Sequence, residues 1–163
     1  MQKSAVIFYS LSGCTRYAAE IIAKKTGAQL IELKLEKPYS KAGAYTKGVI
    51  DLWKNKIPAL KNDFSSLRET DVFYIGGPVW FFTVPPPLRS LAAIQSFAEK
   101  TEGKKIIPFC TDGGNKGKFF EDMPKIFPKA SFCEGKELKH ILRLKPEELE
   151  TEIEEWLKEI GKQ

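Results

Sequence analysis

Short apolar runs alternate with segments of helical periodicity along this chain of 163 residues. Five runs have the length and patterning of strands: residues 5–9, 29–34, 72–75, 105–110 and 130–133. Apolar residues recur at helical spacing in five further segments: residues 15–26, 45–55, 85–99, 119–126 and 146–160. Prolines open the third and the last of these segments, where a helix tolerates them. The pattern therefore predicts strands and helices in strict alternation.

Such alternation is typical of a parallel sheet with helices on both faces and right-handed connections. We expect an α/β fold with a doubly wound, five-stranded parallel sheet in the order 2-1-3-4-5. Pro108 is at odds with a central strand, because proline cannot donate a backbone hydrogen bond. In the expected order, strands one, three and four are neighbours, and ligands bind beyond their carboxyl ends. The loops after these three strands should then line one crevice.

Charge and composition narrow the classes of function. The formal net charge is +5, but the lysines are interleaved with glutamates and lack the dense basic cluster of a nucleic-acid-binding protein. Three cysteines without a C-x-x-C pair argue against a disulfide framework or a zinc site, and His140, the one histidine, is expected to be a surface or core residue. No apolar run spans a bilayer, and no signal peptide is recognisable. We expect a cytoplasmic protein without a metal site that binds neither nucleic acid nor a membrane.

The loop after the first strand reads Ser10-Leu11-Ser12-Gly13-Cys14-Thr15 and opens a helix. Backbone N–H groups at a helix N-terminus, together with serine and threonine hydroxyls, can bind a phosphate. Gly13 allows the backbone to approach the anion closely. The loop has neither the lysine of the G-x-x-x-x-G-K-(S/T) loop nor the spaced glycines of the dinucleotide fingerprint. A serine-capped helix without a ligand is the alternative.

The loops after the third and fourth strands suggest a site for a flat ring. Trp80, Phe81 and Phe82 follow Gly-Gly-Pro and favour a stacking platform, with Trp80 as the best candidate, although they could instead pack into the core. Residues 78–83 contain no glycine, so we expect them to resist a turn that needs positive φ. Residues 111–115 offer backbone N–H groups to the polar edge of a ring, or form a plain turn.

Taken together, these loops resemble those of the flavodoxin family. The first is similar to the family's (S/T)-x-(S/T)-G-(N/H)-T phosphate loop, with Cys14 in place of the usual polar residue. The second, followed by the prolines at 85–87, resembles a subgroup with a G-x-P-x-W segment, and residues 109–114 resemble that subgroup's third loop. The resemblance implies one flavodoxin-like FMN-binding domain over residues 1–163. The implied FMN ligands are Ser10, Ser12, Gly13, Cys14, Thr15, Pro78, Val79, Trp80, Phe81, Phe82, Thr111, Asp112, Gly113 and Gly114.

The resemblance also implies that the redox chemistry occurs on the flavin, without a separate catalytic residue. We expect an electron-transfer protein whose partner is a redox protein or a small-molecule electron acceptor, and which is a monomer or a homodimer. The alternative is an FMN-dependent oxidoreductase that reduces quinones with NADH or NADPH. A signalling receiver domain of the same fold is a remote third reading, because Ser10 and Gly76 stand where that chemistry needs carboxylates. The positive net charge departs from the acidic surface common in flavodoxins.

Overall fold

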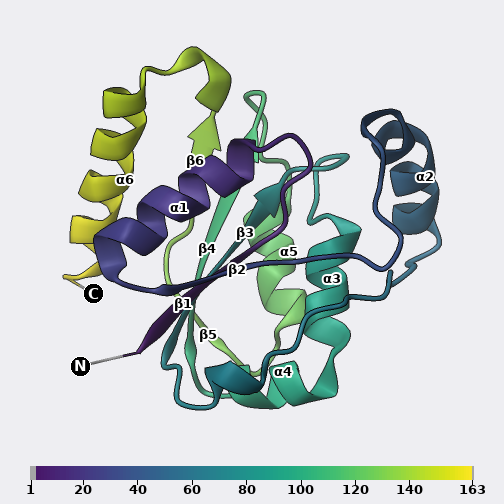
Figure 1. The fold of residues 1–163 in the computed structure, drawn as a ribbon, viewed down its shortest axis with the longest axis horizontal. Helices are drawn as coiled ribbons and strands as arrows, with labels where there is room; N and C mark the ends of the chain where they lie inside the picture. Colours follow the sequence, from purple (N-terminus) through teal and green to yellow (C-terminus); the bar gives the residue numbers. More distant parts are fainter. Residues whose placement is uncertain (1–2, 163) are drawn as a thin grey trace.

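The strands form one parallel sheet in the predicted order (Figure 1). The structure, a computed structural model, describes residues 3–162 without the side chain of Tyr45. The strands are β1 (Ser4–Phe8), β2 (Gln29–Glu32), β3 (Val72–Pro78), β4 (Lys105–Asp112), β5 (Ser131–Phe132) and β6 (Lys136–Lys139). They follow the order β2-β1-β3-β4-β5, and β6 also pairs with β4. The expected doubly wound α/β fold is confirmed.

Helices cover both faces of the sheet. They are α1 (Cys14–Thr26), α2 (Lys41–Trp53), α3 (Pro86–Ala93), α4 (Gln95–Thr101), α5 (Phe119–Ile126) and α6 (Pro146–Ile160), with short 3-10 turns η1 (Ser65–Leu67) and η2 (Ile141–Arg143). Helices α1 and α6 cover one face, whereas α3, α4 and α5 cover the other (Figure 1). Alternate residues of β1 accordingly enter two cores, Val6 and Phe8 on the α1 side and Ala5 and Ile7 on the other. Among residues 3–162, no helix is both long and apolar enough to cross a membrane.

Two helices differ from the sequence prediction. The long helix expected over residues 85–99 is two helices, because Ile94 between α3 and α4 has extended backbone angles of φ −75° and ψ 108°. Helix α2 begins four residues earlier than expected, at Lys41. Ser40 caps it, since its side-chain oxygen accepts a hydrogen bond from Gly43 N at 2.9 Å.

The fifth strand is divided into β5 and β6, and Pro108 lies opposite the division. Ile106 O accepts from Cys133 N at 3.0 Å, and Asp112 O accepts from His140 N at 2.9 Å. Alternate residues of a parallel strand bond to the same neighbour, so Pro108 faces this same side. The N–H that proline lacks would therefore have pointed where β5 has ended and β6 has not begun. The prediction of a single strand over 130–133 was wrong about its length, and the expected conflict at Pro108 does not arise.

Candidate cofactor site

A cavity of about 490 Å³ lies at the carboxyl ends of the central strands, beside the start of α1. Its volume is typical of a ligand-binding pocket. It is lined by Leu11, Ser12, Cys14, Ala44, Pro78, Val79, Trp80, Phe81, Thr111, Asp112, Gly113, His140, Ile141, Leu142 and Arg143. The three loops expected to share a crevice therefore do share one. Five residues of the predicted set belong to these loops but are not part of the cavity wall: Ser10, Gly13, Thr15, Phe82 and Gly114.

The first loop ends in a helix N-terminus without a side-chain cap. Gly13 occupies the N-cap position with φ 98°, and a Cβ built there would meet nothing within 4 Å. No acidic residue lies in the first turn of α1. The backbone N–H groups of that turn and their positive end of the helix dipole are thus available to an anion.

The hydroxyls of the first loop have different environments. Ser10 Oγ accepts a hydrogen bond from Gly13 N at 3.1 Å, which holds the loop in shape. Thr15 is buried, and its Oγ1 lies 2.8 Å from Oγ1 of Thr111, joining the first loop to the third beneath the cavity. Ser12 is exposed and lines the cavity. Among these three hydroxyls, that of Ser12 is therefore the one placed to reach a ligand directly.

The second loop is a tight turn with two phenylalanines at its centre. Trp80 N donates to Thr83 O at 3.1 Å, and Thr83 N donates to Trp80 O at 3.0 Å. Phe81 and Phe82 between them have φ values of 49° and 63°. This glycine-free segment therefore adopts positive φ against its local preference, an outcome that the sequence did not predict. Two positive φ values are the requirement of a type I′ turn, which usually selects Asn and Gly, and each phenylalanine costs on the order of 1–3 kcal/mol there.

Neighbouring groups hold this turn in place. Thr83 Oγ1 donates to Asp122 Oδ2 at 2.5 Å and accepts from an Arg89 guanidinium nitrogen at 3.1 Å. On the other side, Lys118 N donates to Phe82 O at 2.7 Å. Gly117 makes this approach possible, because a Cβ there would lie 2.2 Å from Phe82 O, and its φ of 53° also favours glycine. The second and third loops are thus locked together beside the cavity.

Trp80 is packed more deeply than a surface platform would be. Its side chain is 8% exposed, and its ring makes edge contacts with Tyr9 and Tyr39 at centroid distances of 5.8 and 5.2 Å. Burial raises the pKa of Tyr9 to about 12, with a further contribution from the Glu32 carboxylate, so this tyrosine stays neutral at physiological pH. Trp80 nevertheless lines the cavity. Core packing and exposure to the cavity, which the sequence left as alternatives, thus both apply to this residue.

Asp112 is the carboxylate among the residues that line the cavity. Burial raises its pKa. The hydrogen bond that Gly114 N donates to Oδ1 at 2.5 Å opposes this rise, and the Glu137 carboxylate adds to it. The same hydrogen bond folds the third loop back on itself, so the loop is an ordered turn.

One wall of the cavity was missed by the sequence analysis. It consists of His140 and the η2 turn, Ile141–Arg143, which follow β6. His140 was expected to be a surface or core residue, but it lines the cavity, as do the exposed Leu142 and Arg143. Extending the predicted fifth strand to Lys139 would have identified this segment as another loop at a carboxyl end. Ala44 of α2 also lines the cavity, and no sequence signal indicated it.

The fold and the cavity define the class of doubly wound α/β proteins that bind a ligand at the topological switch point of the sheet. A sequence profile described as flavodoxin matches residues 3–160. The chain therefore belongs to the flavodoxin family.

Solved structures agree with this assignment. A protein from Bacteroides eggerthii that is assigned as a flavoprotein has 25% identity and a TM-score of 0.80, covering 99% of each chain. A flavoprotein from Lactobacillus acidophilus in complex with FMN has 20% identity and a TM-score of 0.72, over 84% of this chain and 93% of that chain. An NADPH-quinone reductase from P. pentosaceus has 13% identity and a TM-score of 0.61, over 98% of each chain. The last two likenesses concern the fold alone. No curated protein sequence matches this chain.

Proposed function

We propose that this chain binds FMN in the cavity described above and uses it to transfer electrons. The proposal is carried by one observation: an uncapped helix N-terminus and an aromatic-lined cavity meet at the switch point of the sheet. FMN has one phosphate and one flat ring, which correspond to these two parts. Membership of the flavodoxin family and the FMN complex of the Lactobacillus acidophilus protein support it.

The first loop would hold the phosphate. The first-turn N–H groups of α1 would donate to phosphate oxygens, and the Ser12 hydroxyl lies on the cavity side of the same loop. Ser10 would act by fixing the loop through Gly13 N, and Thr15 by anchoring it to Thr111. Cys14 lines the cavity in place of the polar residue usual in the family, so binding would depend chiefly on the backbone.

The other loops would hold the ring. Pro78, Val79, Trp80 and Phe81 present apolar surface to the cavity, and Thr111 to Gly113 present polar backbone and side-chain groups. Bound FMN would supply one- or two-electron redox chemistry, while the protein orients the ring and limits its contact with water.

The visible spectrum of the purified protein, with the released flavin identified by chromatography, tests the proposal. We expect a yellow protein that releases FMN in a ratio of about one per chain, as a single phosphate site implies. Release of FAD, or no flavin after reconstitution with FMN, would contradict the proposal.

Steady-state oxidation of NADH and NADPH in the presence of a quinone then separates an electron carrier from an FMN-dependent oxidoreductase. For a carrier, we expect turnover no faster than that of the same concentration of free FMN. Saturable turnover well above that of free FMN would show that the protein is an FMN-dependent oxidoreductase and not an electron carrier.

A further inference from the structure

Positive charge is concentrated at the cavity end of the molecule. The segments that line or flank the cavity are residues 10–16, 40–48, 78–83, 111–118 and 139–145. Together they contain eight lysine and arginine residues and one carboxylate, Asp112. The rest of the chain contains two more carboxylates than cations, although the chain as a whole has a net charge of +5. The excess positive charge therefore belongs to these five segments, which Asp122 and Glu137 contact from outside through Thr83 Oγ1 and Lys116 N.

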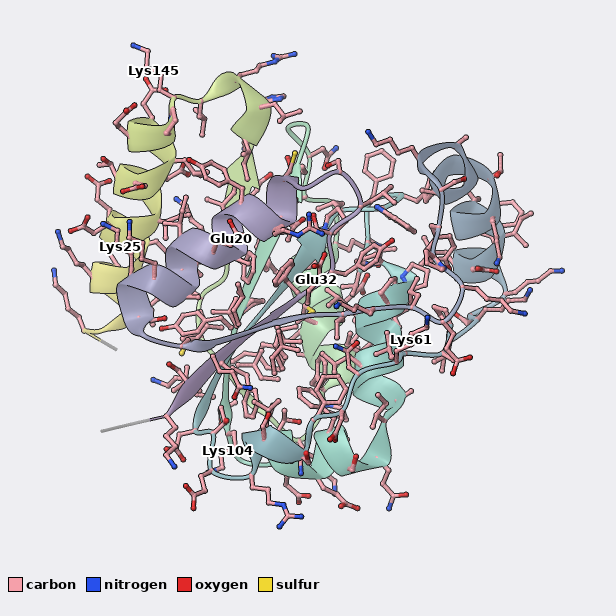
Figure 2. All side chains as sticks on the ribbon, viewed as in Figure 1. Glu20, Lys25, Glu32, Lys61, Lys104 and Lys145 are labelled. Atoms are coloured by element: carbon pink, nitrogen blue, oxygen red, sulfur yellow. The ribbon has the colours of Figure 1, made fainter. Side chains whose placement is uncertain are left out.

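Most of these cations have no ionic partner. Arg16 pairs with Glu32, and Lys139 pairs with Glu137. Within residues 3–162, the other six make no ion pair, and all of them are exposed: Lys41, Lys47, Lys116, Lys118, Arg143 and Lys145. Figure 2 shows Lys145 at the end towards which β6 points, with Lys104 at the opposite end.

Exposed apolar side chains lie within this charged region. Phe81 is 44% exposed, Phe82 62% and Leu142 85%, and both Phe81 and Leu142 line the cavity. The two phenylalanines combine positive φ values, which are unfavourable for a non-glycine residue, with exposed side chains. Exposed apolar groups surrounded by charges are typical of a surface that another protein covers.

We propose that the surface formed by Phe81, Phe82, Leu142 and the six cations docks an acidic redox protein, which exchanges electrons with FMN in the cavity. This inference rests on the proposed function and names the partner of the same site. A positive surface attracts a negative partner over a distance and orients it. A small apolar centre with a charged rim suits a transient complex, as electron transfer requires.

Two other occupants fit the surface less well. A second copy of this chain would bring like charges together, because a two-fold contact places the same surface on both sides. A small electron acceptor needs only to reach the ring, and it would not use six cations spread over three segments of the chain. The positive charge thus favours a protein with an acidic face.

Matched triple variants test the docking surface. K41Q/K116Q/K118Q removes three cations of the surface, none of which lines the cavity. The control K24Q/K100Q/K162Q removes three cations at the C-terminal ends of α1, α4 and α6, which lie at the opposite end of a parallel sheet from the cavity. Both variants lower the net charge by the same amount, so a difference between them reports position.

The probes are two haem proteins of opposite charge, the acidic soluble domain of cytochrome b5 and the basic cytochrome c. The holoprotein, reduced with dithionite and freed of excess reductant, is mixed with each ferric probe in a stopped-flow instrument. Two ferric haems take one electron each from one anionic two-electron-reduced FMN (FMNH−), which returns to the oxidised form and releases one proton to solvent. Retention of the flavin-free protein on immobilised cytochrome b5 gives a second readout that needs no electron transfer.

With cytochrome b5 we expect a rate constant that falls steeply between low and high salt, and with cytochrome c one that rises. At low salt, K41Q/K116Q/K118Q should be about tenfold slower with cytochrome b5 and less retained on the column, with the control nearly unchanged. Equal effects of both variants, or no salt dependence, would overturn the proposal, as would a dimer in sedimentation that K41Q/K116Q/K118Q dissociates. The flavin content and the rate at which the reduced protein reduces a neutral quinone test the proposed function independently of docking. Both triple variants should keep the values of the unsubstituted protein.

Discussion

Gly117→Ala should weaken the contact between the second and third loops. The added Cβ would lie 2.2 Å from Phe82 O and 2.5 Å from its Cα, and these are backbone atoms that cannot turn aside. The loops must therefore separate, and the 2.7 Å hydrogen bond from Lys118 N to Phe82 O would be lost.

The expected loss in the free energy of unfolding has two contributions. Alanine at a φ of 53° costs about 1–2 kcal/mol in the left-handed region, and the lost hydrogen bond costs about 0.5–1.5 kcal/mol more. Gly103→Ala is the matched control. Gly103 also has positive φ, 69°, but its Cβ would meet nothing within 4 Å, so only the first contribution applies. The reduced flexibility of the unfolded chain is common to both variants.

Urea unfolding followed by far-UV circular dichroism measures the free energies of unfolding, and fluorescence titration measures FMN affinity. We expect Gly117→Ala to be less stable than Gly103→Ala by about 1 kcal/mol and to bind FMN more weakly, with Gly103→Ala binding as the unsubstituted protein does. Equal stabilities together with equal FMN affinities would refute the view that Gly117 joins the two loops at the cavity.

Three further predictions concern the cavity. Gly13→Asp should weaken FMN binding by at least about tenfold relative to Gly13→Ala, because both variants share the strain at positive φ but only Asp places a charge beside the phosphate. Equal dissociation constants for the two variants would contradict the proposal that this loop binds the phosphate. Trp80→Ala should lower the free energy of unfolding by about 3–5 kcal/mol, whereas Phe82→Ala should change it far less, since its ring is exposed; urea titrations check both. The raised pKa of Asp112 means that ionising its carboxyl group lowers the free energy of unfolding. This loss of stability is absent below the pKa of the unfolded chain and grows as pH rises through the folded pKa. Asp112→Asn should therefore match the unsubstituted protein at about pH 3, below the usual pKa of an aspartate, and be more stable at pH 7, and an unchanged difference across this range would contradict the shift.

The order of elements and of strands could be predicted because buried parallel strands and amphipathic helices have distinct periodicities. Strand β6 could not, since three of its four residues, Lys136–Lys139, are charged and Leu138 is its one fully buried position. The break at Ile94 likewise carries no local signal, because neither glycine nor proline marks it.

The candidate site was predictable where glycine, serine and aromatic residues follow a strand. The conformation of Phe81 and Phe82 was not, because local preference opposes it and contacts with Asp122, Arg89 and Lys118 outweigh that preference. The wall after β6 was missed together with the strand that positions it.

Because the fifth strand is divided, the segment between β5 and β6 can change in length at this edge of the sheet. In an uninterrupted strand, one inserted residue turns every later side chain to the opposite face. Here β5 is registered against Lys105 and Ile106, and β6 is registered separately against residues 109–112. An insertion within residues 133–135 would be absorbed as a longer bulge, leaving β6 and the segment after it where they are. Evolution can thus lengthen or shorten this edge of the protein without shifting the wall of the cavity.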